Sequence, residues 1–527
     1  MRFLSILVTL ALGCSDWVGA KSEYCRVHPE AASCVDGGGV GGADAGTADA
    51  GFVDAGTDAG QFDAGPDAGL IDAGTGARPV LWARAFGAIN STTIDVSDLD
   101  LTPAGEVLLT GSLSGDIDFG TVLTSTARRP WLARLGSDGT MLSAQVFGPG
   151  SLGTGWTTAV RAGNNGSIFL TGVCASVSIP FPGGLACTPF DGNGSSRTGY
   201  TAHFTPDGGA SWVEQYVNHN GTYVAYLDMG RMGFSKTTGR VMAVGGFGGA
   251  LTFQGHPDEN IQSPGTGEDF WVANDLDGGP AYSRLSGCGN ASSIVPREVA
   301  ATPRGDWYVA LGATGNCGGV AYGADTLGVA KAAADAGLVS WNQKYDGLLG
   351  RADSFSVVAD DDSAWVAAVI RAPYDAGTST FTPSGANDLV VLRLNTNSGN
   401  PVFAIQVGGT GTERVSRLAL DDDGGVWLYG DFNGSNFGSG TMRTVSDSGM
   451  NDVFMMRFDV NTGAPLALRT ITGPGDERAG GFAVTADTLV VSGTFTQTLI
   501  GLGFDGGLSA PNSNWGSARA FVGTVAR

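Results

Sequence analysis

A repeated pattern of short apolar stretches is the feature that most limits how this chain can fold. From Arg78 onward each unit has an alternating apolar stretch, a turn rich in Asp, Asn or Gly, a second apolar stretch that usually ends in Gly, a loop, and a third apolar stretch. The second stretches set the register and lie at 107–111, 168–172, 241–245, 307–312, 365–368, 426–430 and 489–493. Gly111 and Gly493 are 382 residues apart across six intervals, a mean period near 64. Such a period in β-rich units indicates a β-propeller.

Each unit has the apolar pattern of four successive strands. In the sixth unit we expect strands at 418–420, 426–429, 453–458 and 466–470. The domain begins with a stretch of the fourth kind, at 81–86, and ends with one of the third kind, at 520–525. The N-terminal strand is therefore expected to complete the last blade and remove an open edge. The predicted fold class is all-β, a seven-bladed β-propeller over 78–527.

Composition supports this fold and excludes one class of partner. Of the 527 residues 86 are Gly, which favours tight turns over helix interiors. The chain has 51 acidic and 29 basic residues, a net charge of −22, whereas nucleic-acid binders show a basic footprint. We therefore expect no nucleic-acid partner.

The first 77 residues indicate export and a tether. Arg2 precedes an apolar run at 3–13 that is too short to span a bilayer and is typical of a signal peptide over 1–20. Residues 10–14, Leu-Ala-Leu-Gly-Cys, resemble the lipobox of bacterial lipoproteins, which implies a lipid on Cys14. The alternative is cleavage after Ala20, and either route makes the protein an outer-membrane lipoprotein or an extracellular one. Contact with the membrane is then expected through the lipid only.

Residues 21–77 are expected to form a disordered acidic linker. They carry seven Asp-Ala-Gly repeats, with almost no large apolar residue between 36 and 77. Such a segment cannot bury enough apolar surface to fold.

The cysteines suit an oxidising compartment. With Cys14 set aside, six remain, and six cysteines allow fifteen pairings. Spacings of 9, 13 and 29 match no zinc-ligand pattern, so we interpret neighbours as disulfides. The expected pairs are Cys25–Cys34, Cys174–Cys187 and Cys288–Cys317.

Several short motifs resemble the β-propeller repeats of bacterial exported proteins and lipoproteins. They are the approach Val-Gly-Gly-Thr-Gly-Thr-Glu at 407–413, the Gly-rich segments at 111–120 and 430–438, and Asn-Asp-Val-Phe at 451–454. Units three and four depart most from this pattern. The resemblance implies a propeller and an exported location, and for most members it implies no established biochemical activity.

Catalytic motifs were not found. The histidines, at 28, 203, 219 and 256, lack metal-ligand spacing and are expected on the surface or in loops. There is no Gly-x-Ser-x-Gly elbow, P-loop or dinucleotide fingerprint. Residues 205–212 look like the Asp-box of sialidase-type propellers, which we interpret as a structural turn. The chain is therefore predicted not to be an enzyme and to need no cofactor.

Two Asp-rich turns are the weak candidates for a metal. Residues 360–362 and 421–423 could offer oxygen ligands to Ca²⁺, but Asp is also common in such hairpins for turn geometry alone. We assign no metal site and interpret both as solvated turns.

Charged residues before the first strands form the best candidate site. They are Arg297 with Glu298, Arg351 with Asp353, Glu413 with Arg414 and Arg417, and Glu477 with Arg478. Similar places in successive units predict that they gather around the channel mouth, where they could bind a glycan or a carboxylated ligand. The alternative is that each acid pairs with an arginine of the neighbouring blade. Trp156 and Trp515, both expected in loops, could stack on sugars.

The sequence thus predicts a non-catalytic binding or interaction module, monomeric, with an envelope protein or glycan as its partner. The alternatives are a propeller-type enzyme, such as a lyase or glycan hydrolase, with its site in the same mouth, and a purely structural envelope protein.

Overall fold

The computed structural model describes residues 80–527 except 89–92, 149–153, 177, 190–196, 220–226, 249, 254–255, 263–267, 276–279, 285–292, 318–319, 335–338, 351–354, 378, 441, 443–444, 501–507 and 510–517. The expected signal peptide, the linker, Cys14 and the pair Cys25–Cys34 lie outside these residues. So do Cys288 and the side chain of Cys317. Nowhere in the described part does a helix reach the length and apolar character that crossing a bilayer requires.

The described chain is all-β and built from antiparallel meanders in which each strand pairs with the next. The first meanders are β2 (Thr93–Leu101), β3 (Val107–Asp118), β4 (Val122–Leu135) and β5 (Met141–Val146); β6 (Thr154–Ala162), β7 (Ile168–Ala175), β10 (Arg197–Phe204) and β11 (Ala210–His219); and β12 (Leu227–Met229) with β13 (Gly233–Phe234), β14 (Val241–Phe247), β17 (Glu268–Asn274) and β18 (Pro280–Arg284).

The later meanders repeat this order. They are β19 (Ser293–Ala301), β20 (Trp307–Cys317), β21 (Val320–Ala332) and β22 (Val339–Leu349); β23 (Phe355–Ala359), β24 (Ala364–Ile370), β27 (Asp388–Leu394) and β28 (Pro401–Val407); β29 (Glu413–Leu420), β30 (Gly425–Phe432), β31 (Asp452–Asp459) and β32 (Pro465–Ile471); and β33 (Arg478–Val484), β34 (Thr488–Phe495) and β37 (Arg519–Ala526) with β1 (Val80–Ala88).

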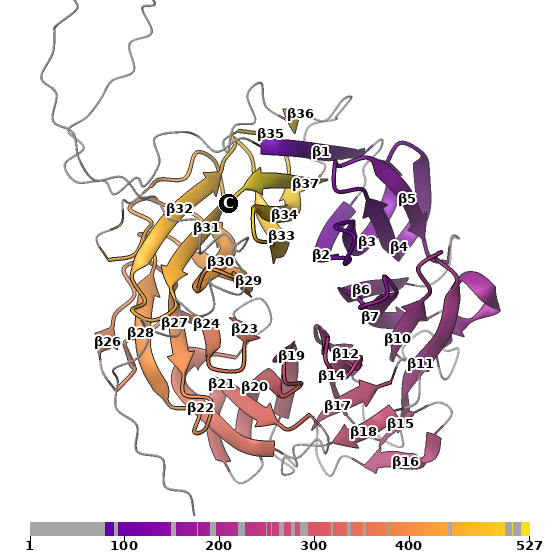
Figure 1. Ribbon diagram of the computed structural model, residues 1–527, viewed down its shortest axis with the longest axis horizontal. Helices are drawn as coiled ribbons and strands as arrows, with labels where there is room; N and C mark the ends of the chain where they lie inside the picture. The colour runs from indigo at the N-terminus through magenta and orange to yellow at the C-terminus, as the bar shows by residue number, and fades with distance from the viewer. Residues whose placement is uncertain are drawn as a thin grey trace, which may run out of the picture. The chain divides into compact units, whose positions relative to one another are not determined.

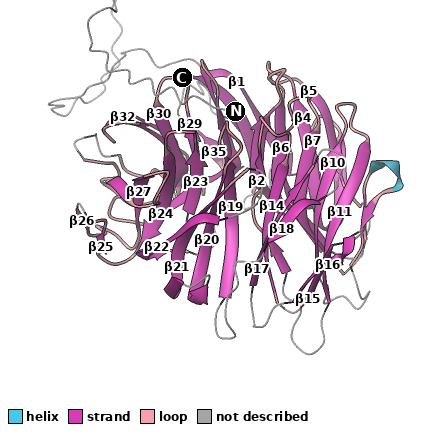
Figure 2. Ribbon diagram, turned by 60° about the horizontal axis from the view of Figure 1, so that its bottom comes forward, coloured by secondary structure: helices cyan, strands magenta, loops and turns pink. Residues whose placement is uncertain are grey.

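Short elements decorate the meanders. They are β8 (Ile179–Pro180), β9 (Ala186–Cys187), β15 (Ala250–Phe253), β16 (His256–Gln262), β25 (Tyr374–Asp375), β26 (Thr380–Phe381), β35 (Thr498–Leu499), β36 (Leu508–Ser509) and the 3₁₀ turn η2 (Pro182–Gly184). Figure 2 shows how completely strands dominate the described chain.

The arrangement of the meanders is propeller-like. In Figure 1 they follow one another around a common centre, with the first strand of each nearest that centre. Contacts between neighbours agree: β2 touches β6, β19 touches β23, β23 touches β29, and β29 touches β33. The predicted all-β class and the four-stranded units are confirmed.

The core fills the space between neighbouring sheets. The indole rings of five tryptophans are almost fully buried there, namely Trp131, Trp271, Trp307, Trp365 and Trp427. Tyr429 of β30 stacks on Phe482 of β33, with ring centres 4.9 Å apart. Large aromatic side chains suit this position because each buries enough apolar surface to join two sheets.

Strand β1 pairs with the C-terminal strand. It runs antiparallel to β37, with Ala83 opposite Gly523 and Phe86 opposite Ala520. The Phe86 side chain is buried and packs on Phe119, with ring centres 4.7 Å apart. The first and last described strands thus lie in one sheet, as the order of stretches predicted.

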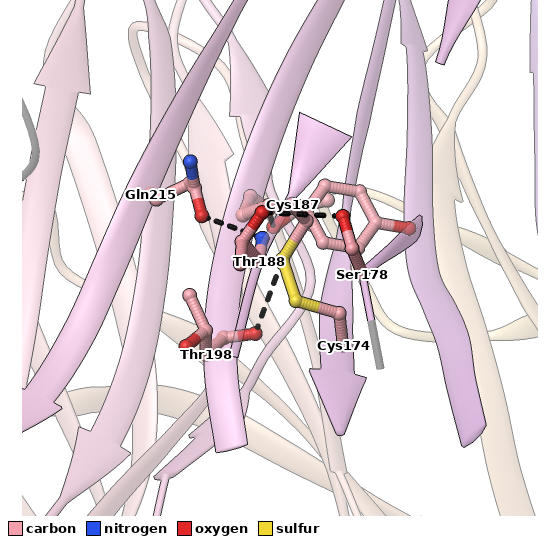
Figure 3. Close-up of a disulfide and its surroundings, with 8 residues drawn as sticks. Cys174, Ser178, Cys187, Thr188, Thr198 and Gln215 are labelled. Carbon is pink, nitrogen blue, oxygen red and sulfur yellow. Dashed lines mark hydrogen bonds between the residues drawn. A yellow bond between two sulfur atoms is a disulfide. The ribbon is translucent and has the colours of Figure 1, made fainter. Parts of the chain in front are cut away.

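The predicted disulfide Cys174–Cys187 is present. It joins the end of β7 to β9, and both cysteines are buried. Figure 3 shows that the next residue, Thr188, donates its N–H to the Gln215 side chain at 2.8 Å and bonds Ser178 at 3.1 Å between hydroxyls. A cross-link over 13 residues restricts the unfolded chain, which stabilises this loop against β10 and β11.

One histidine differs from expectation. His203 was predicted on the surface or in a loop, but it lies inside β10 with 7% of its surface exposed. Its ring stacks on Trp212, and Nδ1 is 2.7 Å from the Ser211 hydroxyl. Burial lowers the pKa of His203, which favours the neutral ring at neutral pH.

The glycine that ends most second apolar stretches has a structural cause. The first strand of the sheet bulges opposite it: the pairing shifts between Val96 and Asp98 in β2, and between Val415 and Arg417 in β29. A Cβ on Gly430 would overlap the carbonyl oxygen of Arg414 on the bulged strand. The sheet with Ala368 at this place pairs without a bulge, so the glycine makes room for the bulge.

We therefore expect Gly430→Ala to lower the free energy of unfolding by more than about 2 kcal/mol, because neither strand can move away. Ala368→Gly, at the equivalent place without a bulge, should cost only about 1 kcal/mol. Urea unfolding of both variants tests this. Equal costs would show that the bulge does not depend on the glycine.

Candidate functional site

The bulges supply charged side chains to the centre of the described sheets. Asp98, Glu298 and Arg417 each directly follow a bulge in β2, β19 and β29. A bulge leaves one residue unpaired and re-aims its neighbour. All three side chains are buried, with 5% or less of each exposed.

These side chains form one network with two further arginines. Arg417 pairs with Asp98 and, at 3.4 Å, with Glu298. Arg161 of β6 donates to Asp98 at 2.6 Å. Arg231, between β12 and β13, reaches Glu298 at 3.4 Å and donates to the Ser416 carbonyl oxygen at 2.6 Å. We call Asp98, Arg161, Arg231, Glu298 and Arg417 the central network.

Burial and charge oppose each other within the network. Burial raises the pKa of Glu298 to about 7, while Arg231 and Arg161 act in the opposite direction. Burial alone would lower the pKa of Arg161, but Asp98 and Asp100 hold it above its usual value. Every charge in the network has an opposite charge in contact, which is the condition for keeping ions away from water. The network is therefore a brace rather than an open binding site.

Arginines outside the centre tie neighbouring sheets together. Arg297 of β19 pairs with Asp228 of β12 at 2.7 Å, and Arg478 of β33 pairs with Asp431 of β30 at 3.0 Å. Arg414 approaches the same Asp431 at 3.9 Å. Arg297 and Arg478 thus pair with aspartates of adjacent sheets. Of the candidate-site acids named in the sequence analysis, only Glu298 pairs with arginines of other sheets, whereas Glu413 and Glu477 have no such partner among the described residues.

The structure corrects where these residues lie. Arg297, Glu413, Arg414 and Arg478 were expected in loops but belong to strands, and Glu477 directly precedes β33. Strand β29 begins before its bulge, in a polar part of the sequence, since Glu413 pairs with Phe432 and Arg414 with Asp431. Because these residues are polar, the alternation of apolar residues could not show that the strand begins there. Arg351, Asp353 and Trp515 lie outside the described residues.

Trp156 was also expected in a loop, and it lies in β6. Its ring is half-buried between two arginines, Arg128 and Arg197, whose guanidinium carbons are each 5.3 Å from the ring centre. Asp95 of the neighbouring β2 pairs with Arg128 at 2.7 Å. Their side chains are 41% and 51% exposed, so this cluster faces solvent, unlike the central network.

A small depression lies beside Arg128, one of the two arginines next to Trp156. It has a volume of about 170 Å³ and is lined by Thr93, Asp95, Ser112, Ser114 and Arg128. Ser112 donates to Asp95, and Arg128 donates to the Ser112 hydroxyl at 2.8 Å. The depression is thus lined by hydroxyls, a carboxylate and a guanidinium, which can donate and accept hydrogen bonds.

The same register position recurs around the sheets. Asp95, Trp156, Arg414 and Arg478 each lie one residue before the position at which the pairing of their strand shifts. They therefore occupy equivalent positions along the first strands of their sheets. Asp95, Arg128 and Arg197 do not stand out in the sequence, because they lie on three separate strands and form no arginine–acid pair of near neighbours.

The Asp-rich turns use their oxygens for the turn itself. Asp360 accepts the backbone N–H groups of Asp362 and Ser363. Asp421 accepts from Trp427 and Arg457. Among the described residues, no group of three or more His, Cys, Asp or Glu is placed to hold a metal ion. Asp207, in the Asp-box-like turn, accepts the Thr205 hydroxyl, as expected of a structural turn.

No protein-family model matches the sequence, and no curated protein matches it. Several solved structures are similar. A protein of unknown function from Dyadobacter fermentans DSM 18053 is 13% identical, with a TM-score of 0.42 over 84% of this chain and 99% of that one. A europium-containing methanol dehydrogenase is 8% identical, with a TM-score of 0.36 over 83% of each chain.

Drosophila Plexin A in complex with Semaphorin 1b is also similar, at 10% identity and a TM-score of 0.36 over 85% of this chain and 87% of that one. All three scores are low, so the propeller-like assignment rests on the strand pairing described above.

The central network makes a prediction for stability. Arg417→Met leaves the buried carboxylates of Asp98 and Glu298 without their shared counter-charge, which should cost about 3–5 kcal/mol of unfolding free energy. Arg304→Ala, at a side chain that is 74% exposed, should cost less than about 1 kcal/mol in the same urea titration. A cost for Arg417→Met no larger than that of Arg304→Ala would rule out a bracing role.

Proposed function

We propose that this chain is an exported, non-catalytic binding module whose ligand face surrounds Trp156. The observation that carries the proposal is the contrast between two sets of charges. Those of the central network are buried and paired, whereas Asp95, Arg128, Arg414 and Arg478 remain partly exposed. Only an exposed set can meet a ligand without first breaking the core.

A glycan with carboxylate groups fits this face best. The Trp156 ring and the hydroxyls of the depression suit a sugar, and arginine binds carboxylates through paired hydrogen bonds. An envelope protein presenting acidic side chains would use the same contacts. The alternatives, an enzyme with its site at this face or a purely structural envelope protein, predict turnover and no ligand respectively.

The proposed scaffold is a monomeric seven-bladed propeller closed by its N-terminal strand, carried by an acidic linker behind a lipid on Cys14. The pairing of β1 with β37 and the contact of β2 with β33 support closure. The linker would hold the binding face away from the outer membrane to which the lipid attaches.

Closure makes a prediction for β1. Phe86→Ala should lower the free energy of unfolding by about 3–5 kcal/mol in a single transition, because a closed ring loses stability as a whole. Leu81→Ala, on the same strand but 54% exposed, should change it by less than about 0.5 kcal/mol. Separate melting of an N-terminal part alone would argue against a closed ring.

Ligand binding is tested by thermal unfolding of the full chain with envelope glycans and carboxylated sugars, because a ligand of the native state raises the midpoint. At 100 times Kd the stabilisation should be about 2.7 kcal/mol. Trp156→Ala and Arg128→Ala should abolish the shift, and Arg304→Ala should keep it. A shift that survives both substitutions would place the site elsewhere, and turnover of the sugar would favour the enzyme.

A further inference from the structure

Two neighbouring units share a sequence signature that the binding face does not use. Residues 384–388 are Ser-Gly-Ala-Asn-Asp, and residues 448–452 are Ser-Gly-Met-Asn-Asp. In both units a Glu follows the Asp after 25 residues, giving the pairs Asp388 with Glu413 and Asp452 with Glu477.

The fold brings both pairs together in the same way. Each Asp begins a third strand, β27 or β31, and each Glu stands at the entry to the next sheet, at β29 or β33. Parallel bridges join the preceding residues, Asn387 to Thr412 and Asn451 to Asp476. The acids that follow these bridges are therefore held side by side, across the junction between two sheets.

The aspartates are held by N–H donors. Asp452 accepts the backbone N–H of Ser448 at 2.7 Å and that of Gly473 at 3.2 Å. Asp388 accepts the backbone N–H of Ser384 at 3.2 Å and the side-chain amide of Gln406. At Asp452 these donors offset part of the effect of burial, which raises the pKa of its carboxyl group.

The glutamates are in the opposite situation. Glu413 and Glu477 have no exposed surface, and their four carboxylate oxygens lack an orienting donor among the described residues. The charged neighbours of Glu477 are Asp452 and Asp476, and that of Glu413 is Asp388. The backbone N–H groups of Gly409 and of Glu413 itself favour the ionised form of Glu413, but burial and Asp388 outweigh them.

The nearby arginines do not relieve these acids. Arg478 pairs with Asp476 and Asp431, and Arg414 approaches Asp431. Thr496, Gln497 and Thr498, which also pack near the Glu477 loop, are uncharged. Two ionised carboxylates buried beside each other would have no positively charged group to compensate them.

We propose that each pair shares one proton, as a hydrogen bond from the Glu carboxyl group to the Asp carboxylate that fastens one sheet to the next. Glu477 lies within hydrogen-bonding reach of Asp452. While both groups are ionised there is no hydrogen between them, and a single proton on Glu477 supplies the missing donor. The same proton removes one of the two buried charges.

A proton fits the pairs better than a divalent cation does. Calcium takes six to eight oxygen ligands. The Asp oxygens here already face N–H groups, whose positive ends repel a cation. A third acid in position to join either pair is not found among the described residues.

The shared proton makes the contact between the sheets weaker at alkaline pH, where the glutamates ionise. Burial, followed by the neighbouring Asp, raises the pKa of Glu477 from 4.5 to about 9 and that of Glu413 to about 8. A raised pKa in the folded state contributes stability that is complete below pH 4.5. This contribution to the free energy of unfolding decreases above pH 4.5, because Glu ionises in the unfolded chain. It is lost once the pH exceeds the pKa values of the two glutamates in the folded protein.

Difference infrared spectroscopy of the full chain tests the proton directly. The wild type at pH 7 should show the C=O stretch of protonated carboxyl groups. Its intensity should fall by two groups in the double variant Glu413→Gln, Glu477→Gln and should be unchanged in Glu106→Gln, at a partly exposed Glu paired with Arg134. An unchanged band in the double variant would overturn the proposal.

Thermal unfolding gives a second readout. The wild-type midpoint should fall as the pH rises from 5 to 9.5, and the double variant should lose much of this dependence because a Gln amide donates to Asp at every pH. A midpoint that Ca²⁺ raises and EDTA lowers only in the wild type would assign the pairs to a cation instead. If the double variant does not fold, the infrared band of the wild type must still lose the intensity of two carboxyl groups as the pH rises through about 8 and 9. A band that does not change between about pH 7.5 and 10 would refute the shared proton.

Discussion

The contacts of Arg417 hold together parts of the chain that sequence separates widely. Its guanidinium meets Asp98, 319 residues away, and Glu298, 119 residues away. Buried charges are stable only while their partners stay in place, so each contact specifies which first strands face one another. Apolar packing between sheets supplies most of the burial, but it is less selective, since many arrangements can bury Leu, Val and Phe.

The central network depends on a backbone feature, the bulge in the first strand. The bulge delivers Asp98, Glu298 and Arg417 to the centre, and a glycine such as Gly111 or Gly430 across the ladder leaves room for it. Where Ala368 replaces that glycine, the ladder is regular and a neutral residue, Ser356, occupies the position facing the centre. The glycine that marks the repeat in the sequence is therefore linked through the bulge to the charges at the centre.

The position of a residue relative to the bulge is linked to whether it is buried or partly exposed. Asp98, Glu298 and Arg417, which follow a bulge, are buried and paired with opposite charges, whereas Asp95 and Trp156, which lie just before one, are only partly buried. The proposed shared-proton pairs, Asp388 with Glu413 and Asp452 with Glu477, add contacts between two further pairs of neighbouring sheets. The acidic chain thus pairs the charges of its central network in the interior, while Asp95, Arg128 and Arg478 remain partly exposed.

The sequence by itself determined the repeat, the strand order within each unit, the pairing of the first with the last stretch and the Cys174–Cys187 disulfide. These follow from local alternation, from turn residues and from short spacings, so neighbouring residues carry the information. It also pointed to Glu298, Arg414, Arg417 and Arg478, but it placed the candidate residues in loops, because apolar alternation stops before the ladder does. Only the tertiary structure decided their partners: Arg231 against Glu298, Arg161 against Asp98, and Trp156 between Arg128 and Arg197. Except for Arg197, which shares a sheet with Trp156, these partners come from different sheets. Which side chains meet depends on bulges and packing that the local pattern does not encode.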